Sequence, residues 1–85
     1  MNYAVFILRR AQDELAALPT EAYQRVKVAI FKLSENPRPS GCRKLSGREG
    51  WRIRVESYRV IYELNDAERK VFVLHIGHRR DVYRS

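Results

Sequence analysis

The sequence predicts an α+β fold in which an N-terminal strand and a helix hairpin pack on a mainly antiparallel four-stranded sheet. Three observations predict this β-α-α-β-β-β order. Residues 3–8 are rich in β-branched and aromatic side chains. Apolar side chains then recur at helical spacing, and three further β-rich runs follow residue 50. Helices that precede a run of consecutive strands favour an antiparallel sheet with the helices on one face.

The first strand and the first helix are expected to follow one another directly. Residues 3–8 are apolar in both alternating sets, which indicates a strand covered on both faces. The period then changes, because Ala11, Leu15 and Leu18 lie four and three residues apart. Pro19 ends this short amphipathic helix.

A second helix is expected after Pro19, with Thr20 as its cap. Its apolar stripe has spacings of three, four and three residues, as in an amphipathic helix. The stripe consists of Tyr23, Val26, Ile30 and Leu33. Asn36-Pro37 stops the helix, so the two helices form a hairpin.

The second half of the chain predicts a loop and a three-stranded meander. Residues 37–50 hold three of the four glycines and two of the three prolines, which is typical of a loop. Strands are expected over residues 51–55, 58–64 and 71–76, where short connections favour antiparallel pairing. Residues 79–85 are expected to form a short C-terminal helical turn.

Length and charge limit the class of protein. With 85 residues, 45% of them hydrophobic and 32% charged, the chain is expected to form one globular domain over residues 1–85. Its 17 basic and 10 acidic side chains give a net charge of +7, and 13 of the basic ones are arginine. An excess of this kind favours a polyanionic partner, either nucleic acid or an acidic protein.

The small number of cysteines and histidines excludes disulfide-bonded and zinc-binding classes of protein. The single Cys42 cannot form an internal disulfide, and with His75 and His78 alone a closed structural metal site is not expected. We therefore expect no metal and no cofactor. The apolar run near the N-terminus is followed by Arg9-Arg10, which fits neither a signal peptide nor a membrane span. We expect a soluble protein of the cytoplasm with no membrane partner.

The segment from Trp51 to Tyr62 carries the main functional signal. If Glu56-Ser57 forms the turn, Arg54 lies opposite Arg59 and Arg52 lies opposite Ile61. The same register pairs Trp51 with Tyr62 and Ile53 with Val60, so these apolar residues face the helices. Arg52, Arg54 and Arg59 then share the other face of the sheet.

Such an arrangement is costly without a ligand. Like charges opposite each other across a strand pair are destabilising, which a small domain tolerates poorly. A bound polyanion would compensate, and the guanidinium fork matches phosphate geometry. The alternative is that these arginines form an ordinary solvated face that binds no ligand. Further basic residues are expected to rim the same face and to contact a nucleic acid there: Arg43, Lys44, Arg48, Arg80 and Arg84.

Three segments resemble the RelE/ParE superfamily of toxins, most closely the RelE branch. They are Trp51-Arg52-Ile53-Arg54-Val55, then Tyr58-Arg59-Val60-Ile61-Tyr62, and Ile76-Gly77-His78-Arg79-Arg80-Asp81-Val82-Tyr83. The resemblance implies a ribosome-dependent mRNA endonuclease of a type II toxin–antitoxin system, bound by a cognate antitoxin in a hetero-oligomer. It also implies the ribosome, its RNA and mRNA as partners.

The resemblance further implies roles for individual residues. Arg59 matches an arginine that holds the scissile phosphate, and Arg79 one that stabilises charge or acts as an acid. Tyr83 matches a tyrosine that orients the nucleophilic ribose hydroxyl or stacks on a base. Arg52 and Arg54 match positions that are lysine in the best-known members, and arginine is a poor proton acceptor.

The residues themselves suggest a division of labour in RNA cleavage. Arg59 and Arg54 would bind the phosphate and Arg79 would stabilise the leaving group, while His78 or Tyr83 would take the proton of the 2′-hydroxyl. His75, within an apolar strand, is expected to be structural. Two alternatives remain open: a ParE-type toxin that inhibits DNA gyrase without catalysis, and an RNA-binding module.

Overall fold

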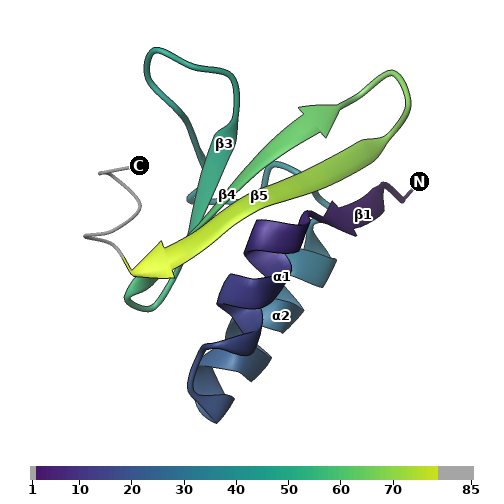
Figure 1. The fold of residues 1–85 in the computed structure, drawn as a ribbon. Helices are drawn as coiled ribbons and strands as arrows, with labels where there is room; N and C mark the ends of the chain where they lie inside the picture. Colours follow the sequence, from purple (N-terminus) through teal and green to yellow (C-terminus); the bar gives the residue numbers. More distant parts are fainter. Residues whose placement is uncertain (1, 79–85) are drawn as a thin grey trace.

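A computed structural model describes residues 2–78 of the chain. The predicted helical turn over residues 79–85 lies outside the described residues. Two helices lie against one face of a five-stranded sheet, as Figure 1 shows. The α+β class and the helix hairpin are confirmed, and none of the described helices is long and apolar enough to cross a membrane.

Within residues 2–78, seven elements follow one another. They are β1 (Ala4–Ile7), α1 (Arg9–Ala16), α2 (Thr20–Lys32), β2 (Arg43–Lys44), β3 (Trp51–Val55), β4 (Tyr58–Asn65) and β5 (Lys70–His78). The strand order in the sheet is β1-β5-β4-β3-β2. β1 runs parallel to β5, and every other pair is antiparallel. The sheet thus has one strand more than the four expected, because Arg43 and Lys44 pair with β3.

Two expectations about the first half of the chain are wrong. The first strand forms an edge of the sheet, and it is not covered on both faces, because Phe6 is 44% exposed. Thr20 is the first residue of α2 and not its cap; Pro19 precedes it in that position without a side-chain hydrogen bond. The fixed φ of Pro19 and its lack of a backbone N–H suit the entry to a helix.

The core lies between the helix pair and the sheet. Val26, Ile30 and Leu33 on the α2 side are fully buried, as the predicted stripe requires. They meet side chains of β4 and β5, among them Val60, Tyr62, Val71 and Val73. Tyr62 also donates a hydrogen bond from its hydroxyl to the Pro37 carbonyl over 2.7 Å, which ties the 37–50 loop to the sheet.

The β3–β4 hairpin has the predicted register. Arg54 pairs with Arg59, Arg52 with Ile61, Ile53 with Val60 and Trp51 with Tyr62. Its turn begins at Glu56, which has the left-handed φ of 57°. At the other end of β3, Gly50 has a φ of +128°, and a Cβ there would come within 3.1 Å of Leu45 and 3.3 Å of the Tyr62 carbonyl. Glycine is therefore required where the chain enters β3.

Candidate nucleic-acid interface

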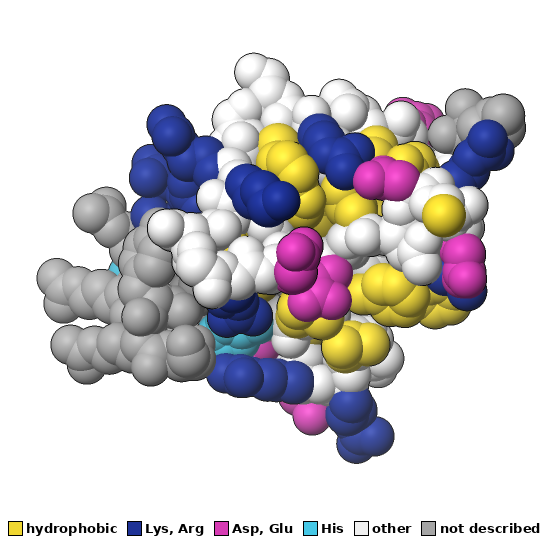
Figure 2. Space-filling view, turned by 90° about the horizontal axis from the view of Figure 1, so that it is seen from above, with side chains coloured by type: hydrophobic (Ala, Val, Ile, Leu, Met, Phe, Trp, Pro, Cys, Tyr) yellow, Lys and Arg dark blue, Asp and Glu magenta, His cyan; other side chains and the backbone are white. Residues whose placement is uncertain are grey.

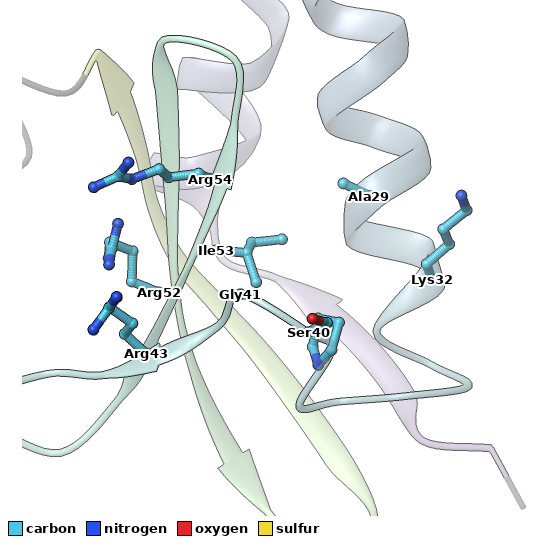
Figure 3. Close-up of a pocket in the computed structure, with 9 residues that line it drawn as sticks. Ala29, Lys32, Ser40, Gly41, Arg43, Arg52, Ile53 and Arg54 are labelled. Atoms are coloured by element: carbon cyan, nitrogen blue, oxygen red, sulfur yellow. The ribbon is translucent and has the colours of Figure 1, made fainter.

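Among the residues that the structure describes, four arginines share the face of the sheet that lies opposite the helices. β2 adds Arg43 to the predicted set, because it pairs with Arg52 in the same cross-strand row. Figure 3 shows that Arg43, Arg52 and Arg54 point to one side of the sheet, whereas Ile53 points toward α2. Arg59 lies opposite Arg54 and so belongs to the same side. We call these four residues the arginine face.

The members of the arginine face differ in exposure. Arg52 and Arg59 are only 5% and 4% exposed, whereas Arg43 and Arg54 are exposed. Both buried residues make further interactions with the rest of the protein. A buried guanidinium is held by its surroundings, so it presents its donors in a fixed direction. The face therefore combines two fixed cations with two that can move to meet a ligand.

Further exposed basic side chains lie on β2 and in the loop that follows it. Figure 2, seen from above the view of Figure 1, shows Lys and Arg side chains in several groups, with acidic and hydrophobic side chains between them. Arg48 is exposed in the loop between β2 and β3. Lys44 is exposed as well, but it pairs with Trp51 and its ammonium lies 6.0 Å from that ring. By the alternation of side chains, Lys44 lies on the opposite side of the strand from Arg43.

A pocket of about 470 Å³ opens along the outer edge of β3, next to the arginine face. It is lined by Ala29, Lys32, Pro39, Ser40, Gly41, Arg43, Arg52, Ile53 and Arg54. Four of these residues are basic and none is acidic. Lys32 is the last residue of α2, and the packing of this helix beside β3 brings it to this edge.

His78 is not grouped with the arginine face. It pairs with Tyr58, and the two rings meet edge-on with their centres 6.0 Å apart. Val60 pairs with Ile76 two residues earlier, so Tyr58 and His78 lie on the helix side of the sheet. The β5 residue opposite Arg59 is Gly77. The predicted site residues Arg79, Arg80, Tyr83 and Arg84 lie outside the described residues.

His75 is structural, as expected. Its ring Nδ1 lies 2.7 Å and 2.9 Å from the two carboxylate oxygens of Glu14 on α1. The backbone N–H of Ile76 donates to the same carboxylate over 2.8 Å. Among residues 2–78, no group of three or more His, Cys, Asp or Glu side chains could hold a metal ion.

A second polar cluster fixes the 37–50 loop at its start. Arg38 donates two hydrogen bonds to the Asp66 carboxylate, over 2.7 Å and 3.2 Å, and Tyr3 donates a third over 2.6 Å. These hydrogen bonds from Arg38 and Tyr3 lower the pKa of Asp66. The Arg38 guanidinium also lies 5.0 Å from the centre of the Trp51 ring. Trp51 is thus half-buried, packed on the core and covered by a cation.

Comparison with known proteins identifies the family. Residues 5–83 match the family described as the ParE toxin of the type II toxin–antitoxin system parDE. No curated protein sequence matches the chain.

Solved structures of RelE toxins have the same fold. The RelE–RelB complex from the archaeon Pyrococcus horikoshii OT3 superposes with a TM-score of 0.82 at 29% identity, covering 93% of this chain and 97% of that one. A mutant of the E. coli toxin RelE in its free state gives a TM-score of 0.79 at 28% identity, over 99% and 93%. The RelBE2 complex of Mycobacterium tuberculosis gives 0.82 at 26% identity, over 93% and 100%. The chain therefore belongs to the RelE/ParE superfamily as a RelE-like toxin of a type II toxin–antitoxin system.

Proposed function

We propose that this toxin is an endoribonuclease that cleaves mRNA in the A site of the ribosome, in the cytoplasm, and thereby stops translation. The observation that carries the proposal is the arginine face, where Arg54 lies opposite Arg59 and Arg43 opposite Arg52. Two rows of guanidinium groups on one side of a sheet match the phosphates of an extended RNA strand. The adjacent basic pocket provides room for a neighbouring nucleotide.

The reaction would use the RNA's own ribose as nucleophile. The 2′-oxygen forms a bond to the adjacent phosphorus while the bond from phosphorus to the 5′-oxygen breaks. The proton of the 2′-hydroxyl passes to a base, and the leaving 5′-oxygen takes up a proton. The products are a 2′,3′-cyclic phosphate and a 5′-hydroxyl end. Catalysis then depends mainly on holding this in-line geometry and stabilising charge on the phosphate.

The arginine face can stabilise the charge on the phosphate. Arg59 matches the phosphate-holding arginine of the family, so it would hold the scissile phosphate, and exposed Arg54 opposite it would close on the same group. Arg79 would stabilise the leaving oxygen. Because His78 lies on the Tyr58 side of the sheet, Tyr83 is the better candidate for the proton acceptor. A His78→Ala variant that keeps full activity would support this choice.

The proposal also implies two binding partners, an antitoxin and the ribosome. The solved complexes from P. horikoshii and E. coli pair a RelE toxin with RelB. We extend this to a cognate antitoxin that forms a hetero-oligomer with the present chain and covers the arginine face. Ribosomal RNA would contact exposed basic residues such as Arg48 and Lys44, and this binding should weaken steeply as salt rises.

The direct test exposes ribosome-bound mRNA to the purified toxin and maps the ends of the fragments. We expect cleavage within the A-site codon, with Arg59→Ala lowering the rate by at least a hundredfold, as for loss of a group that stabilises the transition state. Arg9→Ala is the matched control, because Arg9 is an exposed arginine on α1 that pairs with Asp13. Intact mRNA, or equal rates for the two variants, would contradict the proposal.

The family match itself favours a second candidate, inhibition of DNA gyrase by a ParE-type toxin. A protein that acts only by binding gyrase has no need of a row of phosphate-binding arginines. The two functions separate in one assay: purified gyrase with supercoiled plasmid, run beside the ribosome reaction. Accumulated DNA breaks with intact mRNA would favour the gyrase function, and neither effect would favour a plain RNA-binding module.

A further inference from the structure

The outer side of β5 changes its neighbour partway along the strand. β1 pairs with β5 only from Ala4 opposite Lys70 to Ile7 opposite Val73, and the backbone N–H of Leu8 makes the last hydrogen bond to Val73 over 3.0 Å. β5 continues to His78. Beyond Val73, α1 and not β1 runs alongside the strand (Figure 1). The backbone groups of this section need another hydrogen-bonding partner.

Glu14 of α1 provides that partner. Its Oε1 accepts a hydrogen bond from the backbone N–H of Ile76 over 2.8 Å. Both of its oxygens also lie within 2.9 Å of the His75 ring nitrogen Nδ1. The pair is largely enclosed, with the side chains of His75 and Glu14 only 11% and 26% exposed. One carboxylate thus engages two adjacent residues of β5, as a neighbouring strand would.

Glu14 holds the section of β5 that lies nearest to Arg52 and Arg59, the two buried residues of the arginine face. His75 pairs with Ile61, which in turn pairs with Arg52 across the hairpin. The next residue after Ile76 is Gly77, and it pairs directly with Arg59. An irregularity in the β4–β5 register lies at Ile61 and Tyr62, so the register there is not maintained by an unbroken ladder.

We propose that Glu14 is a positioning residue of the cleavage site, acting through Ile76 and His75 to fix β5 beside Arg59. The inference rests on the proposed function, since it assigns Glu14 to the same site. The carboxylate holds the backbone next to Arg59, which keeps the guanidinium aligned with the scissile phosphate.

The substitution Glu14→Gln tests the inference with little change of shape. The carboxylate accepts charge-assisted hydrogen bonds, whereas the amide has one neutral acceptor oxygen and an NH₂ group, so the hydrogen bond to the Ile76 N–H is lost or weakened. Asp13→Asn is the matched control, because Asp13 is the preceding residue of α1 and pairs only with exposed Arg9 among the contacts described. Glu14→Asp, which keeps the charge but is shorter, is the second variant should the amide fold poorly.

Three measurements are made on the full-length toxin. In Glu14→Gln we expect hydrogen exchange of the Ile76 amide to accelerate at least tenfold, and the Arg59 Nε resonance to shift. We expect kcat on ribosome-bound mRNA to fall roughly tenfold to a hundredfold with KM little changed, because misplacement of the phosphate-binding group weakens transition-state alignment. Asp13→Asn should leave all three unchanged.

The variant Val71→Ala distinguishes the positioning of Arg59 from a general loss of stability. Val71 is fully buried at the opposite end of β5, so this variant loses stability without touching Glu14. Its kcat per folded molecule and its Arg59 resonance should match wild type. If Glu14→Gln behaves in the same way, Glu14 is not a positioning residue. If the wild-type toxin cuts no mRNA, the proposed function is refuted independently of Glu14. The positioning role is refuted separately if the Ile76 exchange rate or the Arg59 resonance is unchanged in Glu14→Gln.

Discussion

Neutralising Arg54 should stabilise the folded toxin while it impairs RNA cleavage. Arg54 lies directly opposite Arg59, and it is the exposed member of the pair. Side chains opposite each other in a sheet begin about 5 Å apart. Two unit charges at that distance in a water-like medium repel by about 0.8 kcal/mol. Arg54→Gln removes this repulsion and keeps most of the side-chain length.

The gain is measurable by thermal unfolding. For a domain of this size, about 0.8 kcal/mol corresponds to a rise in Tm of roughly 3–6 °C. The rise should shrink as salt increases, because salt screens exposed charges. Arg48→Gln is the control for charge alone, since Arg48 is exposed in the loop after β2 and its Tm change should be small. A Tm for Arg54→Gln that falls, or that rises equally at all salt concentrations, would refute the electrostatic reasoning.

Three further predictions concern the scaffold. Ile30→Ala should lower the free energy of unfolding by about 2–5 kcal/mol in urea titrations, because Ile30 is fully buried in the core. Tyr62→Phe should cost about 1 kcal/mol, since the hydroxyl bonds to the Pro37 carbonyl. Burial raises the pKa of Tyr62, so stability should also fall as pH rises above about 10 in wild type and less so in this variant. Hydrogen bonds from Arg38 and Tyr3 lower the pKa of Asp66, so stability should fall as pH drops below about 4, and Asp66→Asn should weaken that dependence in acid titrations followed by circular dichroism.

The hairpin that carries the arginine face was predictable because its signals are local. A two-residue turn fixes the register, and strict alternation in residues 51–55 then decides which side chains share a face. The observed pairing of Arg54 with Arg59 confirms that argument. The α2 stripe was predictable for the same reason, since helical spacing identifies the buried face without knowledge of the partner.

Other features depend on contacts that no local pattern encodes. β2 is two residues long, and it is a strand only because Arg43 and Lys44 meet β3. The apolar residues of β1 read equally well as a covered strand or an edge strand, because periodicity does not give a strand's place in the sheet. The sequence predicts only that Lys32 and Glu14 belong to helices. The packing of those helices brings Lys32 to β3 and Glu14 to β5.

The placement of the acidic side chains explains how a chain with ten of them keeps a basic face. Glu14 holds α1 to β5, Glu56 at the hairpin turn pairs with Arg25 of α2, and Asp66 binds Arg38 and Tyr3. Each of these carboxylates is engaged by a partner from another element of the scaffold. Because they are occupied there, they are not available to neutralise the arginine face. The same ion pairs that stabilise the fold therefore leave the positive charge of the face for a polyanion.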